Sequence, residues 1–163
     1  MTLQIWSKSI WPDKFFLADY YFSIYICSAG FPPPIVILAD FDHMKKKILV
    51  LEKNKDILEL IDIILTEEGY DLDLINSDKE VFDHIKDFGP DAILLDIIHP
   101  TAEGTALCEA IKSSGNTSHI PVIVLSTHPK AEIVKEICAD EVVHKPFDVS
   151  FLVSVIEQQL LIA

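Results

Sequence analysis

The part of the sequence that decides the fold is a short apolar run that ends in an acidic residue. Residues 90–100 read PDAILLDIIHP. Gly89 and Pro90 break the chain before this run, and residues 92–96 then have the continuous apolar character of a strand buried on both faces. Such strands are typical of parallel sheets that helices cover on both sides.

The same kind of run recurs on either side, with helical segments in between. Strands are predicted over 48–51, 71–75, 92–96, 122–126 and 141–144, and helices over 55–68, 78–87, 104–112, 130–137 and 149–161. Ser77 and Glu80 are predicted to form a capping box for the second helix, and Asp148 is a fitting N-cap for the last. Five strand–helix units predict an α/β fold with a doubly wound parallel sheet and helices on both faces.

Length and charge limit the class of protein. The 163 residues suffice for one well-packed domain, and 50% of them are hydrophobic. The formal net charge is −13, and every basic residue is a lysine. Phosphate backbones repel such a polyanion, so we do not expect nucleic acid as a partner. Basic proteins, or a metal cation in an acidic pocket, are the expected partners.

The cysteines carry no sign of a metal site or of a disulfide framework. Cys27, Cys108 and Cys138 lie far apart, are odd in number and form no CxxC pair. We therefore expect separate, buried thiols in a reducing compartment, which favours the cytoplasm.

The composition changes sharply near residue 43. Residues 1–43 hold most of the aromatic residues and few charges, whereas charge is dense from Met44 onward. The apolar stretch 15–29 would extend only about 22 Å as a helix, short of the ~30 Å bilayer core, so stable membrane insertion is not expected. Lys8 and Lys14 leave a signal peptide open as an alternative. The sequence MKKK at 44–47 is typical of the start of a protein. We therefore expect residues 1–43 to be an atypical extension outside the native fold and residues 44–163 to form one domain.

Polar side chains occur at the carboxyl ends of four predicted strands. They are Glu52, Asp96, Ser126 and Lys145. In an open parallel sheet these ends meet along one edge, where ligands bind. Two carboxylates, a hydroxyl and an ammonium suit phosphoryl transfer to a carboxylate beside a hard cation. Each residue alone also has an ordinary structural explanation, so the spacing leaves a functional and a merely structural edge equally open.

Residues 44–161 resemble the receiver domains of response regulators. The resemblance rests on KILVLE at 47–52, PDAILLDIIHP at 90–100, Gly104, IPVIVLS at 120–126 and KPF at 145–147. It implies a flavodoxin-like sheet of five strands in the order 2-1-3-4-5. It also implies a cis peptide bond between Lys145 and Pro146.

The resemblance implies a role for each residue of the edge. Asp96 would accept a phosphoryl group from a histidine kinase or phosphotransfer protein. Mg²⁺ would be held by Glu52, Asp96 and the backbone carbonyl of Ile98. Ser126 would hydrogen-bond the phosphoryl group, and Lys145 would pair with that group and with Asp96.

The implied protein is a single-domain, cytoplasmic signalling protein, and not an enzyme beyond transfer and loss of its own phosphoryl group. Its contact face for an unidentified downstream protein would be residues 130–161. On the last helix, we expect four apolar residues to pack in the core. They are Phe151, Leu152, Val155 and Ile156.

Three positions depart from the family pattern. Lys53 stands where receiver domains usually have a second acidic residue, which places an ammonium near the cation. At about 5 Å and an effective dielectric constant near 20, one unit charge acts on another with roughly 3 kcal/mol, so we expect weakened Mg²⁺ binding. Lys53 could also point outward into water, since its stem is flexible. Val142 replaces the usual aromatic residue of the fifth strand, and Thr127 replaces a smaller residue beside Asp96.

Other readings remain for the same residues. His99, His128 and His144 follow no metal-ligand spacing, so we expect His99 to line the loop beside Asp96 and His144 to point away from Lys145. The alternative function is a phosphorylation-independent docking module on the same fold, favoured by Lys53 and Val142. A flavin carrier or small-molecule enzyme is disfavoured, because residues 53–56 offer no phosphate-binding loop.

Overall fold

The computed structural model describes residues 45–162. The expectations for residues 1–43, an extension or a signal peptide, lie outside the described residues and stay predictions. Among residues 45–162, no helix combines the length and the apolar character that crossing a membrane requires.

Strands and helices alternate along the whole described chain. The strands are β1 (Lys47–Leu51), β2 (Asp71–Ile75), β3 (Ala92–Asp96), β4 (Val122–Ser126) and β5 (Glu141–His144). The helices are α1 (Lys55–Glu67), α2 (Val81–Phe88), α3 (Ala102–Ser113), α4 (Ile133–Ile137) and α5 (Val149–Ile162). The predicted sequence of elements is confirmed.

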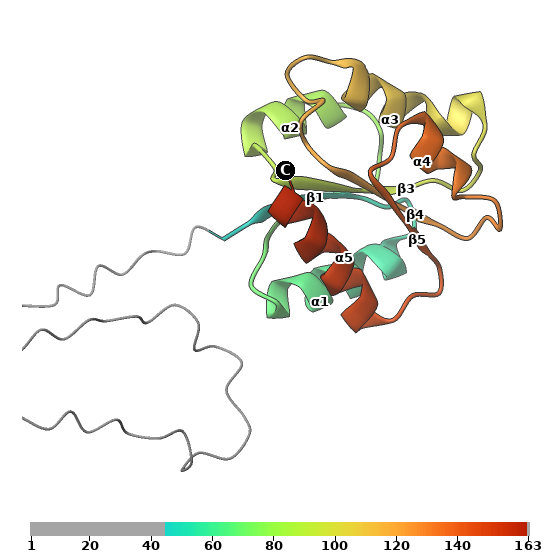
Figure 1. Ribbon diagram of the computed structural model, residues 1–163. Coiled ribbons are helices and arrows are strands. Elements are labelled where there is room, and N and C mark those ends of the chain that lie inside the picture. Colours follow the sequence, from blue (N-terminus) through green and yellow to red (C-terminus); the bar gives the residue numbers. More distant parts are fainter. Residues whose placement is uncertain (1–44, 163) are drawn as a thin grey trace, which may run out of the picture. The chain divides into compact units, whose positions relative to one another are not determined.

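All five strands form one parallel sheet in the order β2-β1-β3-β4-β5. Helices α2, α3 and α4 cover one face, and α1 and α5 cover the other (Figure 1). The predicted doubly wound, flavodoxin-like architecture is therefore confirmed. The Lys145–Pro146 peptide bond is cis, as the resemblance implied.

The central strands are buried on both faces, because each face has its own hydrophobic cluster. Leu49, Ile93 and Val124 pack toward α2, α3 and α4, where the cluster includes Ile85 and Ile111. On the other face, β-strand and helical side chains pack toward α1 and α5. That cluster includes Ile48, Val50, Leu94, Ile123, Ile61, Leu65, Leu152 and Ile156. This two-sided burial explains the continuous apolar runs of the sequence.

Two expectations about helices are wrong. Ser77 and Glu80 do not form a capping box: the Ser77 hydroxyl accepts from the amide of Lys79, and Glu80 is itself the N-cap of α2, with a left-handed backbone. A local Ser turn has replaced the cap. On α5, Leu152, Val155 and Ile156 are buried as expected, but Phe151 is 53% exposed because it lies on the outer side of the helix.

The expectation of separate thiols is also wrong for two of the three cysteines. Cys108 and Cys138 form a disulfide, with their Cα atoms 5.8 Å apart. The two cysteines are 30 positions apart in the sequence, so their proximity could not be inferred from their spacing. The fold creates it by placing α3 and the end of α4 side by side on one face of the sheet. Both cysteines are buried, as expected.

Polar contacts fix the amino-terminal edge of the sheet. The Asp91 carboxylate accepts from the backbone amide of Lys47 at 2.8 Å and from the Lys46 ammonium at 2.9 Å. Burial alone would raise the pKa of Asp91, but these hydrogen bonds outweigh it and hold the pKa below its ordinary value. Lys112 and Asp140 form a second ion pair, at 2.8 Å.

Strand β2 forms an outer edge of the sheet. It carries Asp71, which is exposed, and Asp73, whose carboxylate lies 2.8 Å from the Nδ1 atom of His84 on α2. The strand thus alternates acidic and apolar residues, as expected of a strand that only partly faces the core.

Candidate functional site

The carboxyl edge of the sheet brings together the four strand-end residues that the sequence singled out. Leu51 is level with Leu95, so Glu52 follows β1 beside Asp96, the last residue of β3. Ser126 ends β4 level with His144, and Lys145 follows directly. The parallel register therefore places Glu52, Asp96, Ser126 and Lys145 around one end of β3.

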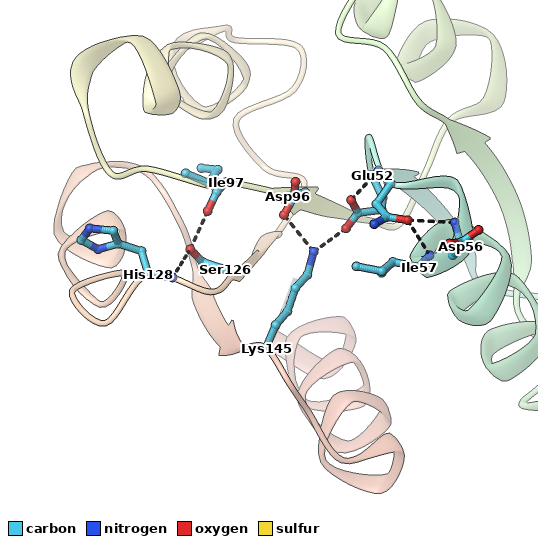
Figure 2. A network of polar contacts seen from close by, with 9 residues as sticks. Glu52, Asp56, Ile57, Asp96, Ile97, Ser126, His128 and Lys145 are labelled. Atoms are coloured by element: carbon cyan, nitrogen blue, oxygen red, sulfur yellow. Dashed lines mark hydrogen bonds and ion pairs between the residues drawn. The ribbon is translucent and has the colours of Figure 1, made fainter.

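Lys145 lies between the two carboxylates. Its ammonium donates to Asp96 Oδ1 at 2.8 Å and to Glu52 Oε2, and Figure 2 shows it bridging the two. The side chains of Lys145 and Asp96 are each 9% exposed and that of Glu52 is 2% exposed. Buried charges of this kind require pairing, and here one ammonium is the counter-ion of both carboxylates.

The second oxygen of Glu52 is also held by the protein. Glu52 Oε1 accepts from the backbone amide of Asn54 at 2.9 Å. Asn54 is in turn the N-cap of α1, and its side chain accepts from the amides of Asp56 and Ile57. The start of α1 and the buried carboxylate are therefore one connected network (Figure 2).

Ser126 is fully buried, and its hydroxyl is already engaged. It donates to the carbonyl oxygen of Ile97 and accepts from the amide of His128 at 3.2 Å. In Figure 2 this contact lies on the side of Asp96 away from Glu52. A bond to a phosphoryl group on Asp96 would require the hydroxyl to leave Ile97.

A pocket of about 220 Å³ opens beside Asp96. Its polar lining includes Lys53, Asp78, His99 and Glu103. Lys53 is exposed, and among the described residues it forms no ion pair. Lys53 therefore lines the pocket from an exposed position.

The loop after Asp96 packs closely on the first turn of α3. Thr101 caps this helix by accepting from the amide of Gly104 at 3.2 Å. A Cβ atom on Gly104 would clash with the carbonyl oxygen of His99. Gly104 therefore permits the close approach that shapes one wall of the pocket.

The three histidines singled out in the sequence, His99, His128 and His144, are arranged as two separate groups. The rings of His99 and His128 meet edge to face, with centroids 6.0 Å apart, and His99 lines the pocket beside Asp96. His144 is exposed and lies 3.2 Å from Glu132, so it points away from Lys145, as strand alternation predicted. No group of three His, Cys, Asp or Glu residues within 45–162 is placed to hold a metal ion.

Receiver domains generally bind Mg²⁺ at the phosphorylation site, but these residues fit that ion poorly. Both oxygens of Glu52 are engaged, and Lys145 already neutralises Asp96. The position after Glu52 supplies an ammonium, on Lys53, where the ion would need another oxygen ligand. The carbonyl of Ile98 would have to complete the site with only partly available carboxylates.

Val142 and Thr127 differ in their surroundings. Val142 is 5% exposed and is level with Val124, and it packs in the hydrophobic cluster on the face of the sheet that α2, α3 and α4 cover. Thr127 is exposed and follows Ser126. An aliphatic residue in the core offers no ring that could swing between an outward and an inward position.

Sequence reasoning missed three residues of the site. Asn54 could have been recognised from its type, because Asn before an acidic first turn is a typical helix cap. Asp78 and Glu103 line the pocket from loops and helix starts that follow β2 and β3. Only the general rule that such loops meet at the carboxyl edge could have indicated them.

Comparison with known proteins agrees with this geometry. Residues 48–157 match the family described as the response regulator receiver domain. The DNA-binding response regulator MtrA of Mycolicibacterium smegmatis is 27% identical over 124 residues, which are 73% of this chain and 52% of that protein. The chain thus spans about half the length of the curated relatives it matches.

Solved structures of receiver domains are also similar to this chain. The receiver domain of a signal transduction histidine kinase from Syntrophus aciditrophicus aligns with a TM-score of 0.62 and 29% identity, over 71% of this chain and 89% of that one. A CheY-like receiver domain protein from Methanospirillum hungatei aligns with a TM-score of 0.62 and 25% identity, over 71% and 94%. With a family match over most of its length and this sheet order, the chain belongs to the response regulator receiver domain family of two-component signalling.

Proposed function

We propose that Asp96 accepts a phosphoryl group from the phosphohistidine of a histidine kinase or phosphotransfer protein. The observation that carries this proposal is the position of Asp96: a carboxylate held by Lys145, next to a pocket that can admit a donor. Response regulators as a class interact with histidine kinases, which makes phosphohistidine the natural donor.

In the proposed step, one Asp96 oxygen attacks phosphorus. The new O–P bond forms as the P–N bond to the donor imidazole breaks, and the electron pair stays on the departing nitrogen. Lys145 holds Oδ1, and among the described residues no hydrogen bond reaches Oδ2, which suits Oδ2 for the attack. Lys145 also remains in place to neutralise the charge that develops on the phosphoryl oxygens.

Ser126 and Lys53 would complete the phosphorylated site. The Ser126 hydroxyl would exchange the carbonyl oxygen of Ile97 for a phosphoryl oxygen. An aspartyl phosphate carries about −2, against −1 for the aspartate, so a second cation becomes useful. Lys53 lines the same pocket and would supply it.

We further propose that Mg²⁺ binds weakly, through Glu52, Asp96 and the Ile98 carbonyl. Binding there competes with the contacts that Glu52 makes with Lys145 and with the Asn54 amide, and it places the cation near the ammonium of Lys53. Both effects oppose the ion. Filling this site should therefore need a higher Mg²⁺ concentration than filling a site with two free acids.

The proposed partners are a kinase or phosphotransfer protein and a downstream protein that contacts residues 130–161. The net charge of −13 disfavours nucleic acid as a direct partner of this chain. We place the protein in the cytoplasm, where such donors act. We assign it no catalytic activity beyond transfer and loss of its own phosphoryl group.

A phosphorylation-independent docking module remains the second candidate. It is favoured by the engagement of Ser126 with Ile97 and by the bridging position of Lys145, which hold the edge in one arrangement without a phosphoryl group. Val142 also removes the aromatic ring on which the usual conformational signal relies.

The deciding experiment is phosphorylation of the full chain by acetyl phosphate, with and without Mg²⁺, followed by intact mass. At high donor and Mg²⁺ concentrations we expect the chain to gain one phosphoryl group. Asp96→Asn should abolish it, whereas Asp78→Asn, a matched change in the same pocket, should leave it in place. No gain at high donor and Mg²⁺ would favour the docking module, above all if Lys53→Asp restored phosphorylation.

A further inference from the structure

We propose that Cys108 and Cys138 form a reversible redox switch that controls how firmly α4 is held on the domain. The disulfide joins the middle of α3 to the residue that caps the end of α4. Nothing in the proposed phosphoryl transfer requires this bond. It joins two helices on the same face of the sheet (Figure 1), and neither cysteine takes part in the hydrogen bonds around Lys145.

The two cysteines differ in their access to solvent. Cys108 is 0% exposed and Cys138 is 8% exposed. Cys138 also ends a helix of five residues whose N-cap, Glu132, makes no side-chain capping bond. The free energy of local unfolding is low for so short a helix, and unfolding it exposes the Cys138 sulfur first. Thiol–disulfide exchange at Cys138 is therefore feasible without unfolding the domain.

Without the disulfide, few contacts hold α4. Of its five residues only Val134 is buried, whereas Ile133 and Ile137 are 48% and 44% exposed. Two polar contacts join the helix region to β5: the ion pair Lys135–Glu141 at 2.6 Å, and Glu132 with His144 Nε2 at 3.2 Å. Such exposed pairs stabilise little. The covalent bond is thus the strongest single restraint on this segment.

The stretch of chain between the two cysteines passes through the site before it reaches α4. The chain between the two cysteines includes β4, Ser126 and His128, and then α4. Oxidation closes this stretch into a covalent loop, so α4 cannot move away from α3. Reduction frees α4 and its exposed isoleucines to move or to meet a partner.

The chemistry balances with a small disulfide as oxidant. The Cys138 thiolate attacks a low-molecular-weight disulfide such as oxidised glutathione, which forms a mixed disulfide and releases one thiolate. The Cys108 thiolate then attacks the Cys138 sulfur and releases the second. Two protons and two electrons leave the cysteine pair, and the small disulfide becomes two thiols. Excess small thiol reverses both steps.

The test uses the full chain carrying Cys27→Ser, so that only the proposed pair can respond. The protein is equilibrated at several ratios of reduced to oxidised glutathione, its free thiols are alkylated, and intact mass counts them. Hydrogen exchange of residues 131–139 is followed at both ends of the series. We expect a two-thiol transition and amide exchange at least ~10-fold slower in the oxidised form. We also expect a Tm higher by roughly 10–15 °C, from closing a loop with a sequence separation of 30.

Cys108→Ser and Cys138→Ser are the matched controls, and both should lose the redox response of exchange. Two results overturn the proposal. One is alkylation of both thiols at every ratio, which means that no disulfide forms. The other is a disulfide whose reduction leaves exchange of residues 131–139 unchanged, which makes the bond a passive brace. No readout involves phosphoryl transfer, so the outcome is independent of the proposed function.

Discussion

Replacing Lys145 by methionine should destabilise the domain strongly, because it leaves two buried carboxylates without a counter-ion. The ammonium lies 2.8 Å from Asp96 Oδ1. At this separation, an effective dielectric constant near 20 gives an attraction of about 6 kcal/mol. The desolvation of all three groups offsets part of this. Measured losses on removing one partner of a buried pair are about 3–5 kcal/mol, which is the range that we expect.

The assay is urea unfolding of the full chain near neutral pH, with thermal unfolding beside it. For a domain of this size, the loss corresponds to a Tm lower by roughly 12–20 °C. Lys130→Met, which removes an exposed lysine, should stay within about 0.5 kcal/mol of the unchanged chain.

A double variant makes this prediction specific to charge. Lys145→Met combined with Glu52→Gln removes one of the two uncompensated carboxylates, so it should be more stable than Lys145→Met alone. A Lys145→Met chain that unfolds within about 1 kcal/mol of the unchanged chain would refute the reasoning, since it would mean that Lys145 is not the counter-ion of a buried pair.

Three further predictions concern single residues. Gly104→Ala should cost about 1–3 kcal/mol in urea unfolding, because the new Cβ meets the His99 carbonyl, whereas Gly115→Ala, with open space around it, should be neutral. Hydrogen bonds hold the pKa of Asp91 below its ordinary value despite burial, so its stabilising contribution is present above the ordinary pKa and is lost as pH falls through the lower folded pKa. Asp91→Asn should therefore cost about 1 kcal/mol in urea unfolding at pH 7, and the cost should shrink as the pH is lowered. Asn54→Ala should cost about 1 kcal/mol through loss of the α1 cap, and an unchanged urea midpoint would contradict that role.

The sheet was predictable because its signals are local. The apolar runs at β3 and β4 are buried on both faces, so each shows its strand character without reference to the rest of the chain. The strand-end residues Glu52, Asp96, Ser126 and Lys145 followed from the rule that parallel strands share a carboxyl edge. The resemblance to a known family then gave the strand order and the expected roles.

What the sequence could not give depends on contacts between distant segments. The disulfide of Cys108 and Cys138 arises only when α3 and α4 pack together, and no spacing rule covers it. The turn of Ser126 toward Ile97 is set by side-chain geometry and not by residue type. At the start of α2, the sequence allows Ser77 either a capping box with Glu80 or a local turn. The Ser77 hydroxyl forms the turn, by accepting from the amide of Lys79.

The acidic outer edge of the sheet also bears on self-association. An edge strand presents unpaired backbone groups, and at high concentration a second copy of the same chain is the neighbour that it meets most often. Asp71 and Asp73 lie two residues apart on β2, so antiparallel pairing of two copies through this strand would set like charges against each other. The sheet is thereby discouraged from growing past β2 into a continuous intermolecular sheet.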